Sequence, residues 1–425
     1  MVKIALSESK KRQKLLSRRA NTSYLCFRTI IQLIYSMEKL QQHFAKLLRE
    51  TDTRFHRYLY GQINWTNRMV GLTGPRGVGK TTLVLQHIKE NLPRDTSLYV
   101  TAEDFYFSTH RLADLADDFE KMGGTHLFID EIHKYPDWSK ELKLIYDYHP
   151  GLHVTFTGSS VLDINKGAAD LSRRAVMYRM QGLSFREYLE LFRGIRIGVH
   201  ALGDILSHRV ECPDDFHPMP HFADYLRQGY YPFALDGDFD LRLQQIINQT
   251  LEADIPQYAG INASTARKLK QLLAIIARSV PFKPNISSIA QMLGSSRNSI
   301  ADYCLYIEEA GFIAQLRDAT GGIRGLGKVD KIYLDNTNLV QALGRENADK
   351  GNLRETFFFN QMRVTHDVIA SPVSDFRIGD LTFEVGGRNK KQKQLQGIDK
   401  GYVVKDDIET GYTNVVPLWQ FGLTY

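Results

Sequence analysis

The sequence has few cysteines and no long hydrophobic run, and both shortages exclude classes of protein. Its three cysteines, Cys26, Cys212 and Cys304, lie far apart and form no CxxC pair. This spacing argues against a zinc module and against a disulfide framework, and it is what we expect of a protein in a reducing cytoplasm. No apolar stretch reaches the roughly 18 residues that a membrane helix needs, so we expect no membrane partner.

Net positive charge is confined to one short tail. The net charge is +6, but residues 1–36 alone hold eight basic residues and one acid, a net of +7. The rest of the chain therefore carries −1, which gives no electrostatic argument that it binds a polyanion. The tail is consistent with a basic arm or a transit-like leader, and equally with an over-extended start before the well-patterned segment that opens at Met37.

The length of 425 residues predicts two or three domains of roughly 150 residues each. Apolar residues at helical spacing predict a helix from Met37 to about Leu59. Short apolar runs alternating with helical stretches up to Met180 then predict a parallel sheet with helices on both faces, an α/β core. Two helical patterns joined by a Gly-Ser-Ser turn and followed by the strand-like FIAQL outline a winged helix. The expected divisions are a basic extension (1–36), the α/β core (37–199), a helical lid or linker (200–260), the winged helix (261–325) and a mixed C-terminal domain (326–425).

The segment GPRGVGKTT matches GxxxxGK[ST] in full, and it lies between a strand, RMVGLT, and an amphipathic helix. Its glycines let backbone amides turn around phosphates, and the following helix adds its own N–H groups. Lys80 is expected to reach the β- and γ-phosphates during catalysis, and Thr81 to donate its hydroxyl to Mg²⁺. The sequence therefore predicts an ATP and Mg²⁺ site formed by Gly74, Pro75, Arg76, Gly77, Val78, Gly79, Lys80, Thr81 and Thr82.

A second motif, THLFIDEIHK, is an apolar strand that ends in Asp130 and Glu131. Two acids at a strand tip next to the phosphate-loop strand suit metal-dependent hydrolysis. We expect Asp130 to hold the Mg²⁺ shell and Glu131 to act as general base on the attacking water. His126 and His133 flank the pair with no usual zinc spacing, so packing or surface roles are expected for them.

Two further candidates follow along the chain. The strand HVTFTGSS ends in hydroxyl side chains, of which Ser159 or Thr157 would sense the γ-phosphate, although a plain strand-to-loop turn explains them equally well. Arg173 and Arg174 precede the last strand, AVMYRM. An arginine there can stabilise the transferring phosphoryl group, usually in a neighbouring subunit, and surface salt bridging is the alternative.

The order of these motifs resembles the AAA+ plan. The stretches FIDEIHKYPDWSKELKLIYD, TFTGSS and LSRRAVMYRMQGLSFREYL resemble a prokaryotic family of AAA-type ATPases more closely, as do NLRETFFFNQM and SDFRIGDLTFEVGGRNK. The resemblance runs from about Met37 to the end. It implies a P-loop NTPase core, a helical lid, a winged helix and a C-terminal α/β domain like PD-(D/E)XK restriction endonucleases, of unknown function. It favours Arg174 as the finger arginine, although that residue follows Arg173 where the family generally has glycine.

The same resemblance implies a degenerate nuclease site. Asp375 and Glu384 match the positions of the metal-binding acids, and Glu355 on the preceding helix supports them. The position of the water-activating lysine is Gly386, and Arg388 or Lys390 in the next turn would be displaced from the required geometry. We therefore expect a nuclease-like fold that does not cleave.

The winged helix leaves two roles open. A recognition helix over residues 297–311 would present Arg297, Asn298 and Ser299 at its amino end, where base contacts often start. That helix carries one basic residue against three acids, Asp302, Glu308 and Glu309, which is poor for a DNA reader. A packing module beside the ATPase core is the alternative.

The leading hypothesis is an ATP-hydrolysing AAA-type protein that couples nucleotide state to its C-terminal domains. It would work as a homo-oligomer or with a protein partner, with DNA as a further candidate partner through the winged helix. The first alternative is a nucleotide-gated protein-interaction switch with little turnover. The second is an ATP-dependent nuclease that uses the C-terminal domain.

Overall fold

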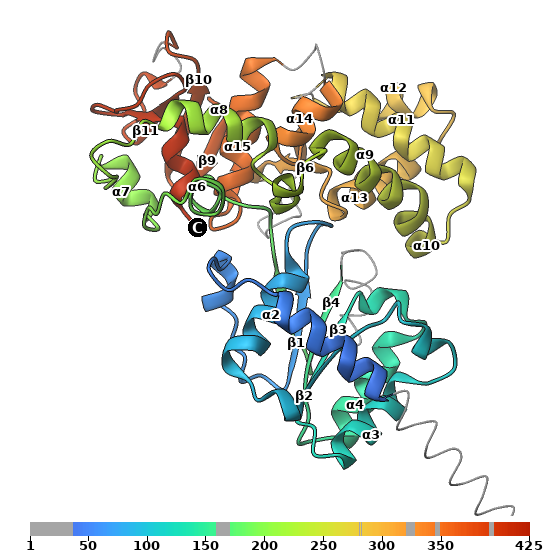
Figure 1. The fold of residues 1–425 in the computed structure, drawn as a ribbon. Coiled ribbons are helices and arrows are strands. Elements are labelled where there is room, and N and C mark those ends of the chain that lie inside the picture. Colours follow the sequence, from blue (N-terminus) through green and yellow to red (C-terminus); the bar gives the residue numbers. More distant parts are fainter. Residues whose placement is uncertain are drawn as a thin grey trace, which may run out of the picture.

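The computed structural model describes residues 37–158, 171–279, 281, 283–319, 328–344, 349–390 and 395–425. Two lobes are visible in Figure 1: a sheet lobe, residues 37–180, and a C-terminal lobe, residues 181–425. Ser159, the expected phosphate sensor, and the basic extension 1–36 lie outside the described residues.

The sheet lobe is built on parallel strands, and β1, β3 and β4 are buried on both faces, as their continuous apolar runs predict. Their order is β2-β3-β4-β1-β5. The expected parallel α/β core is therefore confirmed, but the expectation that the acidic strand borders the phosphate-loop strand is wrong, because β4 lies between β3 and β1. The strands are β1 (Met69–Thr73), β2 (Ser97–Thr101), β3 (His126–Asp130), β4 (His153–Gly158) and β5 (Val176–Arg179).

Helices and short 3-10 turns connect these strands (Figure 1). A helix over residues 37–50 comes first and ends nine residues before the predicted Leu59, which lies instead in a separate 3-10 turn. Its Phe44 stacks on Tyr99 of β2 with ring centroids 6.4 Å apart. The other elements are η1 (Tyr58–Gly61), α2 (Lys80–Asn91), η2 (Arg94–Thr96), η3 (Phe105–Ser108), α3 (Leu112–Lys121), η4 (Ile132–Lys134) and α4 (Trp138–Tyr148).

The C-terminal lobe begins with helices. The first, α6, starts at a capping box in which Ser184 and Glu187 satisfy each other's backbone N–H groups. Between α9 and α10 the chain forms one π-helical turn, η6. These elements are α6 (Phe185–Arg193), α7 (Leu202–Leu206), α8 (Pro218–Gln228), η5 (Pro232–Asp236), α9 (Phe239–Gln249), η6 (Thr250–Asp254) and α10 (Ile255–Ala259).

Three helices and an antiparallel strand pair follow, over the part for which a winged helix was expected. The second strand, β7, lies beyond residue 325, so the pair crosses the expected boundary between the last two domains. The elements are α11 (Ala263–Ser279), α12 (Ile286–Met292), α13 (Arg297–Glu309), β6 (Ile313–Arg317) and β7 (Val329–Leu334).

The chain ends in a mixed sheet of order β12-β11-β10-β9-β8. Strands β8, β9 and β10 pair antiparallel, and β10, β11 and β12 pair parallel. The elements are α14 (Thr337–Gly344), α15 (Lys350–Met362), β8 (Val368–Ala370), β9 (Phe376–Ile378), β10 (Leu381–Gly386), β11 (Gly401–Lys405), β12 (Val415–Pro417) and η10 (Leu418–Leu423).

Two large clusters of buried apolar side chains stabilise this arrangement. The first joins the sheet lobe, through residues such as Leu72, to Leu243 and Leu339 of the C-terminal lobe. The second joins Phe185 of α6 to Phe357 of α15 and the last sheet. Helix α6 lies within the range 37–199 expected for the core, yet it packs with the C-terminal lobe. Among the described residues, no helix combines the length and the apolar character needed to cross a membrane.

Candidate nucleotide-binding site

The loop between β1 and α2 turns on glycines that other residues cannot replace without strain. Gly74, Gly77 and Gly79 have φ of +151°, +78° and +99°, a region that favours glycine. A Cβ on Gly74 would lie 2.2 Å from the carbonyl oxygen of Met180. The loop ends at Gly79, the N-cap of α2, so the unpaired N–H groups of the first turn of that helix face the loop.

Lys80 is buried inside this loop, with 5% of its surface exposed. Its Nζ donates hydrogen bonds to the carbonyl oxygens of Gly74 and Pro75, both at 2.8 Å. Burial lowers the pKa of Lys80 to about 8, against the opposing influence of Glu131 and Asp130. A buried ammonium beside a helix N-terminus fits a polyphosphate group.

Asp130 is the point where hydroxyl groups from three elements converge. Thr81 Oγ1 donates to its Oδ2 at 2.7 Å, and Tyr99 OH donates to the same oxygen at 2.6 Å. Thr157 Oγ1, from the intervening strand β4, donates to Oδ1. Carboxylate and hydroxyl oxygens are the ligands Mg²⁺ prefers, so Thr81 and Asp130 fit a magnesium ion.

Glu131 occupies a strained turn directly after β3. Its φ of +52° places a residue with a Cβ in the left-handed region, which costs energy and is frequent at functional sites. Its backbone N–H donates to Thr157 Oγ1 at 3.4 Å. The side chain is 19% exposed, and its Oε2 lies 3.5 Å from His133 Nε2. Glu131 is therefore partly exposed beside Asp130.

The two histidines beside the acids do not come together. His126 lies at the amino end of β3 and stacks on His153 with centroids 5.0 Å apart. The side chain of His133 is 1% exposed, and neither ring nitrogen has a hydrogen-bond partner among the described residues. Burial lowers the pKa of His133 to about 3, so this ring is neutral beside Glu131.

Arg174 lies at the other edge of the sheet from the phosphate loop. It precedes β5, whose amino end pairs with Val70, whereas the loop follows the carboxyl end of β1. Its guanidinium donates two hydrogen bonds to Asp147, at 2.9 and 3.0 Å. Arg174 therefore does not contribute to the site of its own chain.

Two acids of the expected nuclease site lie together around a lysine. Lys331 Nζ, from β7, lies 3.3 Å from Glu355 Oε2 and 3.4 Å from Asp375 Oδ1. Tyr333 OH donates to Glu355 at 2.7 Å, and burial raises the pKa of Glu355. Lys331 thus forms ion pairs with both carboxylates that the resemblance assigns to a metal.

The third acid, Glu384 on β10, has a separate lysine. Lys390 Nζ lies 2.5 Å from Glu384 Oε1. The Lys390 stem covers Gly386, where an added Cβ would lie 2.6 Å from its Cδ. Within the described ranges, no group of three His, Cys, Asp or Glu side chains is arranged to hold a metal ion. In the described structure the three acids of this site are therefore ion-paired with lysines.

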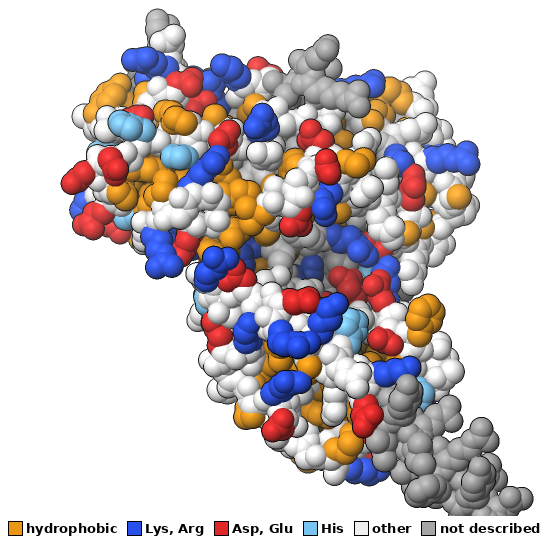
Figure 2. All heavy atoms as spheres, viewed as in Figure 1, with side chains coloured by type: hydrophobic (Ala, Val, Ile, Leu, Met, Phe, Trp, Pro, Cys, Tyr) orange, Lys and Arg blue, Asp and Glu red, His pale blue; other side chains and the backbone are white. Residues whose placement is uncertain are grey.

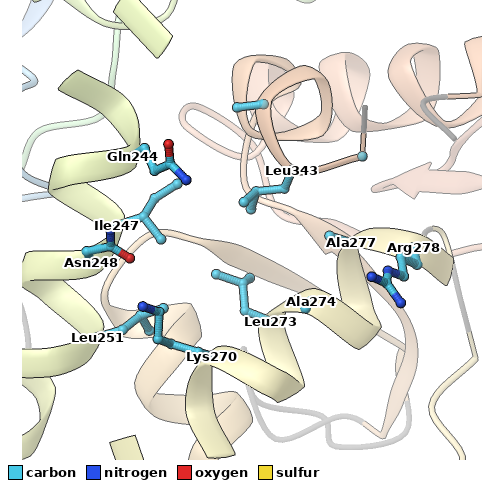
Figure 3. Close-up of a pocket in the computed structure, with 12 residues that line it drawn as sticks. Gln244, Ile247, Asn248, Leu251, Lys270, Leu273, Ala274, Ala277, Arg278 and Leu343 are labelled. Atoms are coloured by element: carbon cyan, nitrogen blue, oxygen red, sulfur yellow. The ribbon is translucent and has the colours of Figure 1, made fainter. Parts of the chain in front are cut away.

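One hollow borders the residues predicted to bind the nucleotide, and another lies away from them. One of about 260 Å³, between the helix over residues 37–50 and the ends of β2 and β3, is lined in part by Tyr99, Asp130 and Glu131. The other, of about 790 Å³, lies between α9, α11 and α14 (Figure 3). Leu251, Leu273 and other mainly aliphatic side chains line it, and it contains none of the predicted site residues.

Sequence reasoning missed Tyr99 as a partner of Asp130. The only signal was a phenol within an otherwise apolar strand. It also missed Asp254, whose carboxylate accepts hydrogen bonds from Arg76 at 2.7 Å and from Lys134 at 3.0 Å. Nothing in the local sequence connects a helical aspartate to a loop 178 residues away.

Two family models match parts of this chain. Residues 66–189 match a family described as an AAA domain, and residues 219–350 match one described as a domain of unknown function, DUF8612. A similar curated protein, uncharacterized protein MJ1637 of Methanocaldococcus jannaschii, is 25% identical over 274 residues. The match covers 60% of this chain and 57% of that protein, so it spans little more than half of the relative.

Solved structures give distant similarities. The Walker-type ATPase PABY2304 of Pyrococcus abyssi is 14% identical with a TM-score of 0.39, over 65% of this chain and 91% of its own. AMPPCP-bound DnaA from Aquifex aeolicus is 12% identical with a TM-score of 0.24, over 62% of this chain and 86% of its own. The assignment of a domain type to residues 66–189 depends on the family match and on the phosphate loop, the strand order and the acidic pair described above. Residues 66–189 form an AAA-type P-loop domain.

Proposed function

We propose that this protein binds and hydrolyses Mg-ATP at the phosphate loop, and that its C-terminal lobe responds to the nucleotide state. The observation that carries the proposal is the convergence of Thr81, Tyr99 and Thr157 on Asp130, beside the buried ammonium of Lys80. The three hydroxyls orient the carboxylate that would hold Mg²⁺, and the ammonium can offset negative charge on a transferring phosphoryl group.

Each residue has one role in this proposal. Gly74 to Thr82 enclose the phosphates, and Lys80 offsets the charge of the β- and γ-phosphates. Thr81 and Asp130 hold Mg²⁺, which when bound withdraws charge from the phosphate oxygens. Glu131 accepts a proton from the attacking water, so that ATP and water yield ADP and phosphate.

A response of the C-terminal lobe is supported by what touches the loop. A Cβ on Gly77 would lie 2.8 Å from the ring of Phe233, and one on Gly311 would lie 2.6 Å from Pro75. Phe233 and Gly311 both belong to the C-terminal lobe, so a change in loop conformation displaces that lobe. The same contacts favour a second candidate, a nucleotide-gated switch with slow turnover.

The proposal includes self-assembly, with Arg174 completing the site of a neighbouring copy. Its place at the far edge of the sheet, away from the loop of its own chain and with a side chain 24% exposed, supports this. DNA remains a candidate partner through α13, whose Arg297 and Asn298 are exposed. We do not extend the proposal to cleavage of nucleic acid, because the acids that such a reaction needs are ion-paired with Lys331 and Lys390.

Phosphate release from Mg-ATP tests this proposal. We expect turnover in the wild type and its loss, by at least about 100-fold, in Lys80→Ala and Glu131→Gln. Glu131→Gln should still bind ATP. Lys89→Ala, on the exposed side of the same helix α2, is the matched control and should behave as wild type.

Adding single- or double-stranded DNA to the same assay identifies the target. Stimulation would assign DNA to the C-terminal lobe, and indifference would leave a protein partner. ATP binding without turnover in the wild type would favour the switch, and absence of binding would refute the whole proposal.

A further inference from the structure

A carboxylate of the C-terminal lobe holds two cations at the mouth of the phosphate loop. Arg76 donates from Nε to Asp254 Oδ2 at 2.7 Å and from Nη2 to Oδ1 at 3.2 Å. Lys134 Nζ donates to Asp254 Oδ1 at 3.0 Å. The Asp254 side chain is 1% exposed, against 23% for Arg76 and 18% for Lys134. One buried acid therefore joins the phosphate loop, the turn after Glu131 and the C-terminal lobe.

A rare backbone feature presents this acid. Asp254 ends η6, the π-helical turn between α9 and α10. Single π-helical turns are uncommon in proteins, but those that occur often lie at functional sites. The elements before it also lie on the loop, since a Cβ on Gly77 would meet Phe233 of η5 and Ile246 of α9.

The two cations lie close in sequence to Lys80 and Glu131, the residues that the proposed function places around the terminal phosphate. Arg76 is part of the phosphate loop, four residues before Lys80, and Lys134 lies three residues after Glu131. Burial opposes the ionisation of Asp254, but Arg76 and then Lys134 hold its pKa below the usual value. Figure 2 shows side chains of both charges gathered at the junction of the lobes.

A second polar contact between the lobes lies behind the loop, and a phosphate does not compete for it. Arg57 donates to Glu187 Oε1 of α6 at 3.0 Å, and also to the carbonyl oxygens of Val78 and Gln181. Arg57 is 5% exposed and Glu187 is fully buried. This pair connects one side of the loop to the C-terminal lobe.

We propose that Asp254 competes with the terminal phosphate of the bound nucleotide for Arg76 and Lys134. Binding of the triphosphate then loosens this contact while the Arg57–Glu187 contact holds. The inference rests on the proposed function and names the residue through which nucleotide state reaches the C-terminal lobe. A carboxylate facing the incoming phosphate disfavours its binding by like-charge repulsion. The coupling is reciprocal: ATP weakens the contact of Asp254 with the two cations, and that contact lowers the affinity for ATP to the same extent.

Nucleotide affinity in an Asp254→Asn variant tests this competition. The substitution keeps the shape and removes the charge, so we expect a non-hydrolysable ATP analogue to bind about 5- to 20-fold more tightly. ADP, which lacks the terminal phosphate, should change by less than about 2-fold. Asp254→Glu should restore the wild-type ratio. The control is Asp240→Asn, an exposed aspartate on α9, which should leave both affinities unchanged.

Small-angle scattering of the same proteins measures the lobe response. Wild type should change its radius of gyration with the ATP analogue but not with ADP, and Asp254→Asn should give the same radius with either. An unchanged ATP to ADP ratio, or a wild-type scattering response in Asp254→Asn, overturns the inference and leaves the proposed ATPase intact. A wild type that binds no ATP overturns the proposed function instead.

Should Asp254→Asn fail to fold, Lys134→Gln provides the same test. It retains the Arg76–Asp254 pair and removes one of the two cations. We expect about 3- to 10-fold weaker binding of the ATP analogue, little change for ADP and a smaller scattering response. Equal losses for both nucleotides would show a general role in binding and would overturn the competition.

Discussion

At the scale of single residues, the orientation of the Asp130 carboxylate depends on hydroxyl groups that belong to no sequence motif, above all that of Tyr99. Tyr99 OH donates to the same Oδ2 that accepts from Thr81. Burial and the neighbouring Asp130 raise the pKa of Tyr99, so the phenol stays protonated and can donate to the carboxylate. A neutral donor fixed on a carboxylate orients it before any metal arrives.

Replacing Tyr99 with phenylalanine tests this orientation. The ring and its packing remain, but Asp130 loses one hydrogen bond, worth about 1 kcal/mol. We expect phosphate release to fall about 3- to 10-fold and the Mg²⁺ concentration for half-maximal turnover to rise. Tyr148→Phe, on the exposed side of α4, should change neither. A Tyr99→Phe enzyme with wild-type Mg²⁺ dependence contradicts the assignment.

A second residue, His87, makes stability depend on pH. Its ring stacks on Trp65 with centroids 3.7 Å apart, and burial lowers its pKa to about 4. An unfolded chain binds this proton from pH 6.5 downward, whereas the folded protein resists it until about pH 4. Stability therefore falls between these values by roughly 1–3 kcal/mol from this group, and no further below pH 4.

The His87→Phe variant checks the size of that contribution, because it keeps an aromatic ring on Trp65 and removes the titrating nitrogens. Urea unfolding at pH 7.5 and 4.5 should show a smaller loss of stability in the variant than in the wild type. The carboxylates titrate equally in both proteins, so the difference isolates His87. Parallel losses would refute the prediction.

At the scale of elements, the first turn of α6 is the part most sensitive to substitution. Glu187 caps its own helix through the Ser184 N–H, and its Oε1 accepts hydrogen bonds from Arg57 Nε and Tyr58 N. Removing one partner of a buried ion pair leaves the other charge uncompensated, so Glu187→Ala should cost about 3–5 kcal/mol of unfolding free energy. Glu190→Ala, on the same helix but in more exposed pairs with Arg186 and Arg196, should cost less than about 1 kcal/mol. Chemical denaturation compares them; equal losses would contradict the assignment.

Elements were predictable from sequence where the signal was local. The strand and helix around the phosphate loop follow from apolar periodicity and from glycines that need positive φ. Strand order did not follow, because the position of β4 between β1 and β3 depends on how the whole sheet assembles. The end of the first helix at residue 50 was missed because Leu59 continues the apolar pattern beyond it.

Side-chain partners distant in sequence were beyond prediction for the same reason. The Arg76–Asp254 contact spans 178 residues and the Lys331–Asp375 contact spans 44. In both contacts, the residues next to each charged side chain in the sequence give no indication of its partner. The acids of the C-terminal domain were located by resemblance, but the lysines that neutralise them became visible only in the structure.

At the scale of the whole molecule, the phosphate loop is held between two lobes that share one apolar cluster. Leu72 of β1 and Leu243 of α9 belong to the same cluster, so the lobes move against each other only by disturbing a packed interior. Such an interior has few alternative arrangements. A nucleotide therefore acts on the C-terminal lobe through the loop contacts, and a displacement of that lobe repacks part of this cluster.

At this scale, substitution of Arg174, the candidate finger arginine, tests whether copies of the protein assemble. Because Arg174 lies opposite its own loop, Arg174→Ala should retain ATP binding and lose turnover about 100-fold or more. Mixing Arg174→Ala with Glu131→Gln should restore part of the activity, since some sites then pair an intact Glu131 with an intact Arg174 from the neighbour. The exposed neighbour Arg173→Ala should keep wild-type turnover. The measurement is phosphate release from the mixture, compared with that from each variant alone. If Arg174→Ala alone keeps full activity and mixing raises it no further, Arg174 only pairs with Asp147.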